Sequence, residues 1–129
     1  HPMYAADRAC VNTLAHANDL CEELGEGLGV AVDAYHVWWD PNLNREIQRA
    51  AGHILGFHVC DWLVPTTDFL LDRGMMGDGI IDLAAMNKMV TAAGYEGPIE
   101  VEIFSAENWW KREGDDVMAT IVKRFEHVV

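Results

Sequence analysis

Three residues of this chain, an aspartate, a histidine and a glutamate, occupy comparable positions near the ends of three separate apolar segments. Asp33 follows the run LGVAV, His58 lies in HILGFHVCD, and Glu102 lies in GPIEVEIF. Carboxylate oxygens and an imidazole nitrogen together suit a divalent ion such as Mn²⁺, Mg²⁺, Co²⁺ or Zn²⁺. Such a cation would also remove the cost of burying two carboxylates close together. The residue types therefore indicate a site for one divalent metal ion.

Each of these residues also has a purely structural explanation. Asp33 can cap the end of a strand, Glu102 can face solvent on an alternating strand, and a lone histidine such as His58 is more often a hydrogen-bonded core residue than a ligand. The metal site is favoured because all three types occur at matched positions of consecutive segments. Such a site requires elements that bring the three segment ends together.

The chain alternates between helical and strand-like patterns. Apolar residues at helical spacing predict helices at residues 6–25, 44–52 and 80–95 and in the last part of 105–129. Short apolar runs predict strands at residues 28–33, 53–61 and 97–104. Residues 62–79, punctuated by Pro and Gly, are predicted to form a long loop, and loops of this length are usually functional. The order α-β-α-β-α-β-α makes the strands parallel.

Three parallel strands with intervening helices can form a small layered sheet or one part of a (β/α)8 barrel. Each βα unit runs to about 30 residues, in line with about 250 residues for eight units, which favours the barrel. Barrel active sites lie at the carboxyl ends of the strands, where all three segments carry polar residues. The predicted fold class is therefore α/β. Strand parity directs Asp33, His58 and Glu102 toward the same end, with Glu100 one layer deeper.

Length, charge and cysteine usage narrow the classes of partner. The 129 residues, enough for one domain, carry 21 Asp and Glu against nine Lys and Arg, a formal net charge of −12. Nucleic acid is not expected as a partner, because phosphate binding requires a basic face. Three cysteines without C-x-x-C spacing indicate free thiols in a reducing cytoplasm. No membrane association is expected, since no apolar run approaches the ~20 residues of a spanning helix.

Four motifs follow one another along the chain. They are D-x-x-H (33–36), F-H-V-C-D (57–61), R-x-x-x-G-D-G (73–79) and G-Y-x-G-P-I-x-V-E-I-F (94–104). In this order they resemble the C-terminal half of the xylose isomerase-like TIM barrels, most closely the sugar phosphate isomerases and epimerases of the inosose isomerase and ketose 3-epimerase types. The resemblance covers essentially the whole chain. The ordered set is fairly specific, whereas D-x-x-H or G-D-G alone would carry little weight.

The resemblance implies a fold and a chemistry. Residues 1–129 would form about strands six to eight, with flanking helices, of a (β/α)8 barrel that binds one divalent metal ion. Asp33, His58 and Glu102 would be three of its metal ligands. His36 and Arg73 would contact substrate oxygens, and His36 and Glu102 would act in catalysis. The implied reaction is isomerisation or epimerisation of a sugar, sugar phosphate or inositol derivative, in which a proton moves by way of an enediolate.

The chain departs from the family pattern at its beginning. Family members have a fourth ligand, a glutamate from strand five, which would lie a few residues upstream of His1 because HPMY resembles the loop that follows that strand. We therefore expect the N-terminal half of the barrel, with this glutamate, to be absent from the chain and the chain to be inactive alone. Open sheet edges would favour self-association, so a homo-oligomer is compatible with the sequence.

Two other functions fit part of the pattern. A metal-dependent hydrolase of the endonuclease IV type would need more histidines at the strand ends and a basic surface, and the net charge of −12 disfavours it. A non-catalytic sugar-binding or structural half-barrel that has lost its metal would need no ligand set. The role of Asp61 is also open, because it can support His58 or the metal, or cap its strand.

Overall fold

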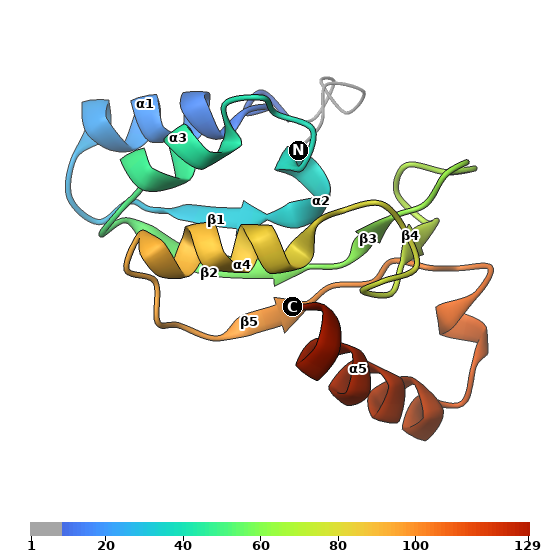
Figure 1. Cartoon of the computed structure of the whole chain (residues 1–129). Coiled ribbons are helices and arrows are strands. Elements are labelled where there is room, and N and C mark those ends of the chain that lie inside the picture. The colour runs from blue at the N-terminus through green and yellow to red at the C-terminus, as the bar shows by residue number, and fades with distance from the viewer. Residues whose placement is uncertain (1–8) are drawn as a thin grey trace.

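A parallel three-stranded sheet lies at the centre of the computed structural model, which describes residues 9–129 (Figure 1). Its strands are β1 (Val30–Asp33), β2 (Ile54–Val59) and β5 (Ile99–Val101), in the spatial order β1-β2-β5. The register pairs Asp33 with His58, and His58 with Glu100. The carboxyl ends of all three strands therefore meet at one edge of the fold.

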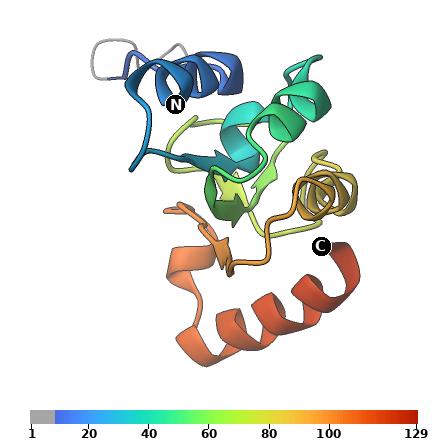
Figure 2. The same cartoon turned by 90° about the vertical axis from the view of Figure 1, so that its left-hand side faces the viewer.

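The longer helices gather on one side of this sheet (Figure 2). The helices are α1 (Leu14–Leu24), α2 (Ala34–Val37), α3 (Leu43–Arg49), α4 (Leu83–Ala92) and α5 (Gly114–Val128), with a short 3-10 helix at Trp109–Lys111. Side-chain caps fix two of the helix starts, since Thr13 Oγ1 accepts from the His16 N–H (3.2 Å) and Asp82 Oδ1 from the Ala85 N–H (2.9 Å). Among the described residues, no helix is long and apolar enough to cross a membrane.

The two faces of the sheet differ in burial, as the two-residue period of a strand requires. Val32, Phe57 and Val59 are fully buried and pack with apolar side chains of the helices in the core cluster. On the opposite face Ala31 and Glu100 are exposed. Figure 2 shows that the helices cover the face of Val32 and not this one. The face without helices is the one toward which the predicted site residues point.

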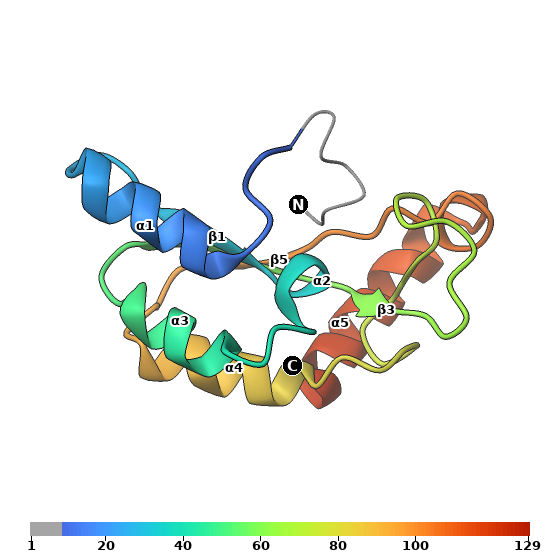
Figure 3. The same ribbon diagram turned by 90° about the horizontal axis from the view of Figure 1, so that it is seen from above.

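A second, two-stranded sheet stands beyond the carboxyl ends of the first. It pairs β3 (Asp61–Trp62) with β4 (Arg73–Gly74) in antiparallel fashion. The Arg73 N–H donates to the Phe104 carbonyl (2.9 Å), so the chain after β5 runs beside β4. Figure 3 shows α2, β3 and the following loop gathered at this end of the molecule. These segments build the surroundings of the candidate site.

Several predicted boundaries were wrong. The first helix begins at Leu14, with Thr13 as its cap, so Cys10 lies outside it and is exposed; residues 6–8 of the predicted range lie outside the described residues. The third strand ends at Val101, although the Glu102 N–H still donates to the Val59 carbonyl (3.0 Å). The predicted loop at 62–79 contains β4, and helix α2 directly after β1 was not predicted.

Candidate metal centre

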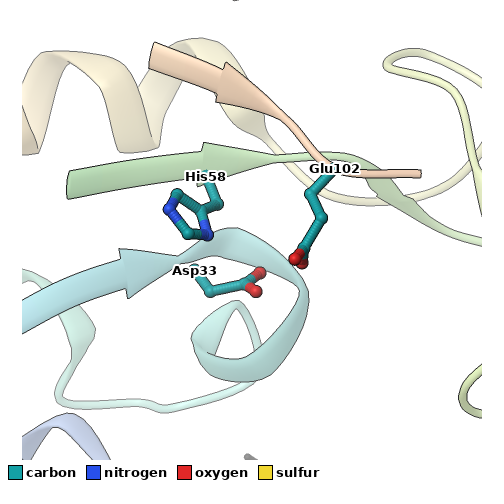
Figure 4. Close-up of side chains that lie close together, drawn as sticks. All are labelled: Asp33, His58 and Glu102. Atoms are coloured by element: carbon teal, nitrogen blue, oxygen red, sulfur yellow. The ribbon is translucent and has the colours of Figure 1, made fainter. Parts of the chain in front are cut away.

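Asp33, His58 and Glu102 converge at the carboxyl ends of the three parallel strands. Asp33 is the last residue of β1, His58 lies beside it on β2, and Glu102 follows β5. One ligand atom from each residue lies within 4.8 Å of the other two. Figure 4 shows the two carboxylates turned toward one another, with the imidazole close by. Gly56 leaves room here, because an added Cβ would lie 3.4 Å from His58 Nε2.

The spacing of these three groups fits a single divalent ion after a small adjustment. Nitrogen and oxygen ligands lie about 2.0–2.2 Å from a zinc ion, so two ligand atoms of one ion are at most about 4.4 Å apart. The separations of up to 4.8 Å exceed this limit by a few tenths of an ångström. Rotation of partly exposed side chains covers such a difference, so the residues fit the group.

Arg73 supplies the positive charge of the site. Its Nη1 donates to Glu102 Oε2 (2.7 Å) and lies 3.9 Å from Asp33 Oδ2. The guanidinium is buried, and it packs over the rings of Tyr35 and Phe104, with its Cζ 4.4 Å and 4.8 Å from the two ring centroids. Arg73 thus holds one oxygen of Glu102 and leaves the other oxygen of that carboxylate available.

Asp33 combines a structural and a chemical position. Its Oδ1 accepts from the Tyr35 N–H (2.9 Å) and so caps α2. Burial raises the pKa of its carboxyl to about 6, the nearby Glu102 carboxylate adds to the rise, and Arg73 opposes it. The sequence offered a capping role and a metal-binding role for Asp33 as alternatives. The two roles are compatible, because Oδ1 makes the cap and Oδ2 is left for a metal ion.

His36 lies in the first turn after β1 and is buried beside Asp33 and Arg73. Its Nε2 is 3.4 Å from Asp33 Oδ2 and 3.5 Å from Arg73 Nη2. Burial and then the Arg73 charge lower the pKa of the imidazole to about 3. His36 is therefore neutral at physiological pH and can exchange hydrogen bonds with a hydroxyl group without carrying charge.

Asp61 has a role that neither sequence-based alternative described. Its carboxylate is buried and accepts four backbone N–H groups, from Trp62, Gly77, Gly79 and Ile81, at 2.8–2.9 Å. The residue therefore organises the segment 77–81 and makes no hydrogen bond to His58 among those found. The G-D-G segment that it binds lies 16–18 residues further along the chain, so the sequence carried no local signal for this role.

Gly79 and Asp78 complete this turn. A Cβ at Gly79 would lie 2.1 Å from the Trp62 carbonyl oxygen, so only glycine fits against β3. Asp78 Oδ2 accepts from the Met75 N–H (3.1 Å) and from Trp109 Nε1 (3.0 Å), and its Oδ1 accepts from Arg124 Nη1 on α5. The G-D-G segment is thus fastened both to β3 and to the last helix.

The tryptophans after β1 and β5 serve mainly in packing. Trp38 packs against Trp62 at a centroid distance of 5.7 Å with the rings tilted, whereas Trp39 is half exposed and donates from Nε1 to the His36 carbonyl (3.0 Å). Trp109 is buried in the core, and Trp110 is exposed with its edge on Phe104. None of these tryptophans lines the pocket at the candidate site.

A pocket of about 410 Å³ opens over the three convergent residues, a size typical of small-molecule sites. One part of its wall is apolar and the other part is polar. The lining residues are Ala31, Asp33, His36, His58, Leu70, Arg73, Glu102 and Phe104. All five predicted site residues line this one pocket. Leu70 and Phe104 were not predicted as site residues. An apolar loop side chain such as Leu70 carries no sequence signal for a pocket wall, whereas Phe104 shares the strand parity of Glu102.

Comparisons with known proteins agree on one family. A family model described as xylose isomerase-like TIM barrel matches residues 1–120. L-ribulose-5-phosphate 3-epimerase UlaE of Shigella flexneri serotype 5b is 28% identical over 90 residues, which are 70% of this chain and 28% of that protein.

Two solved structures resemble the chain. Protein SMc04130 of Sinorhizobium meliloti 1021 matches with a TM-score of 0.96 and 62% identity over 99% of this chain and 47% of that one. The IOLI protein, solved with a binding zinc atom, matches with a TM-score of 0.76 and 26% identity over 92% of this chain and 44% of that one. The chain therefore spans less than half the length of each of these relatives.

Proposed function

The chain belongs to the xylose isomerase-like TIM barrel family, and we propose that its protein is a divalent-metal-dependent isomerase or epimerase of a sugar, sugar phosphate or inositol derivative. The observation that carries the proposal is the convergence of Asp33, His58 and Glu102 within 4.8 Å in one pocket. Two relatives support it in kind, since one is named as a ketose-phosphate 3-epimerase and another was solved with a zinc atom.

We assign the metal-binding role to Asp33, His58 and Glu102. Their two carboxylate oxygens and one imidazole nitrogen suit Mn²⁺, Mg²⁺, Co²⁺ or Zn²⁺. A divalent ion held there would supply Lewis-acid polarisation of a substrate carbonyl, which stabilises the negative charge of an enediolate. Only three protein ligands come from the described residues, which leaves positions for substrate oxygens or a further protein ligand.

Glu102 is the proposed proton carrier. One of its oxygens is bonded to Arg73 Nη1 (2.7 Å), so the remaining oxygen would serve both the metal ion and the proton. A carboxylate in this position can take a proton from a carbon next to a carbonyl and return it to the neighbouring carbon, which isomerises the sugar. Epimerisation instead needs a second acid that protonates the first carbon from its opposite face. His36, neutral because burial lowers its pKa, would then bind a substrate hydroxyl, and Arg73 would donate to a second substrate oxygen.

Residues 1–129 would on this proposal be one part of the barrel domain. The described residues contribute three neighbouring strands, and the relatives are more than twice as long. The expected partner is a small-molecule sugar, not nucleic acid. A nuclease of the endonuclease IV type is less well supported, because the net charge is −12 and the metal-ligand group of the described residues contains one histidine.

Metal titration tests the proposal. Calorimetry with Mn²⁺ should show one site in the wild-type protein and at least a tenfold loss of affinity in Asp33→Asn, His58→Gln and Glu102→Gln. Glu100→Gln is the matched control, because its exposed carboxylate lies on the same face only 4.0 Å from His58. Epimerisation of ketoses should stop on chelation and return with Mn²⁺. Full ketose turnover by protein depleted of metal would refute the proposed function.

A further inference from the structure

The loops around the pocket determine what charge a substrate can carry. We propose that the substrate is an uncharged ketose or cyclic polyol ketone and that these loops discriminate against a phosphorylated sugar. This inference rests on the proposed function. Two independent observations carry this inference. The first is that internal carboxylates already bind the backbone N–H groups of these loops. The second is the excess of negative over positive side chains in the loops after the strands.

Phosphate sites in TIM barrels are commonly built from the loops after the last two strands, with backbone N–H groups and a helix start facing the anion. The family resemblance equates these strands with β2 and β5. The loop after β2 has the glycine-rich turn from which such a site is made, the MMGDG segment (75–79). Consecutive N–H groups in a turn of this kind form an anion-binding nest.

The protein's own aspartates occupy these backbone donors. Asp61 takes the N–H groups of Gly77, Gly79 and Ile81, at 2.8–2.9 Å. Asp68 Oδ1 accepts from the N–H groups of residues 70 and 71, at 2.8 Å and 2.9 Å. These donors are therefore already bound to the protein's own carboxylates, and a phosphate at the glycine-rich turn would have to displace the buried Asp61 carboxylate.

The charge of the loops acts in the same direction. The three loops after β1, β2 and β5, at residues 34–42, 60–82 and 102–113, carry nine carboxylates and three cationic side chains. The carboxylates are Asp40, Asp61, Asp68, Asp72, Asp78, Asp82, Glu102, Glu107 and Glu113, and the cationic residues are Arg73, Lys111 and Arg112. Arg124 of α5 pairs with Asp78 and offsets one of these carboxylates. A phosphate dianion bound among these loops would still meet a net negative field.

Each cationic side chain of these loops is already engaged. Arg73 is bonded to Glu102 (2.7 Å), and Lys111 is paired with Glu107. Arg112 bonds the Asn108 side chain (2.8 Å) and lies over the Trp109 ring at 3.9 Å from its centroid. The polar wall of the pocket and the apolar side chains of Leu70 and Phe104 suit a molecule with hydroxyl groups on one side and C–H groups on the other, such as a neutral polyol.

Matched substrate pairs test the inference. The Mn²⁺-loaded full-length protein is assayed with ribulose and ribulose 5-phosphate, and with fructose and fructose 6-phosphate, between 20 mM and 500 mM NaCl. We expect kcat/KM for the neutral ketose to exceed that of its phosphate at least tenfold. Salt should raise kcat/KM for the phosphate severalfold, since it screens repulsion, and change that for the neutral ketose less than twofold.

A charge variant gives a second readout. Asp72→Asn removes a carboxylate next to Arg73, and it should raise kcat/KM for the phosphorylated ketose about fourfold, the effect of one charge about 10 Å from a dianion in water. Glu126→Gln on α5 is the matched control and should change neither rate. A phosphorylated ketose that is preferred, with a rate that falls with salt, would overturn the inference and leave the proposed function intact. Turnover of neither member of any pair, together with no turnover of an inosose, would overturn both.

Discussion

Replacement of Asp33 by asparagine should stabilise the metal-free protein at neutral pH while abolishing its response to metal. Burial raises the pKa of the Asp33 carboxyl from its ordinary value of 3.8 to about 6. The difference between these pKa values corresponds to about 3 kcal/mol. Asparagine has no charge to desolvate, and its side-chain oxygen can still accept from the Tyr35 N–H and cap α2.

The pH dependence follows from the direction of the shift. Because the folded-state pKa of Asp33 lies above the unfolded-state value, folding favours the protonated carboxyl. This contribution is fully present below about pH 4 and is lost as the pH rises through about 6. Asp33→Asn should therefore raise the free energy of unfolding by roughly 2–3 kcal/mol at pH 7.5 and leave it nearly unchanged at pH 4.

Urea denaturation in the presence of a chelator, at pH 4, 5.5 and 7.5, measures this difference. Glu100→Gln, an exposed neighbour of His58, is the control and should stay within about 0.5 kcal/mol of wild type. Addition of Mn²⁺ at pH 7.5 should raise the unfolding midpoint of the wild type and not that of Asp33→Asn. An Asp33→Asn protein that is less stable at pH 7.5, or changed equally at all three pH values, would refute the reasoning.

Other consequences of the geometry can be tested by single changes. Asp61→Ala should lower the free energy of unfolding by 3 kcal/mol or more, because four backbone N–H groups lose their buried acceptor, and a fully folded variant in urea titrations would contradict this. Arg73→Met should lower the free energy of unfolding of the metal-free protein by about 3 kcal/mol, since it leaves two carboxylates without their buried counter-charge. Mn²⁺ should then raise the Tm of the variant more than that of the wild type. An equal rise in Tm would argue against Mn²⁺ binding between these two carboxylates. Gly79→Ala should prevent native packing of β3, which near-ultraviolet circular dichroism would report, because its Cβ would lie 2.1 Å from a carbonyl oxygen. Burial raises the pKa of the Cys60 thiol to about 12, so mass spectrometry after iodoacetamide at pH 8 should find Cys10 modified and Cys60 intact in the native protein.

Much of the fold could be predicted from the sequence because the strand patterns, the helix patterns and their order along the chain all indicated the same α/β fold. The short apolar strands and the helical spacing between them gave the α/β class and the parallel order, and the membership of the xylose isomerase-like family confirms both the recognition and the barrel class. Strand parity brought Asp33, His58 and Glu102 to one end, where the structure has them within 4.8 Å. Their role as metal ligands stays a prediction.

The sequence predicted less where tertiary contacts override local pattern. The helix expected from residue 6 begins at Leu14, because Thr13 offers a cap that the apolar spacing does not reveal. β3 and β4 are two residues each, too short for any periodic signal, and they pair with one another and with the chain after β5, through the Arg73 N–H and the Phe104 carbonyl. The function of Asp61 depends on four N–H groups up to 20 residues away, which no local motif encodes.

The central claim is that Asp33, His58 and Glu102 hold one divalent ion at the carboxyl ends of the strands. Anomalous diffraction at the manganese edge from crystals of the protein grown with Mn²⁺ tests it directly. We expect one strong peak about 2.0–2.3 Å from an oxygen of Asp33, an oxygen of Glu102 and a nitrogen of His58. A manganese peak elsewhere, with these three side chains still bonded among themselves and to Arg73, would contradict it.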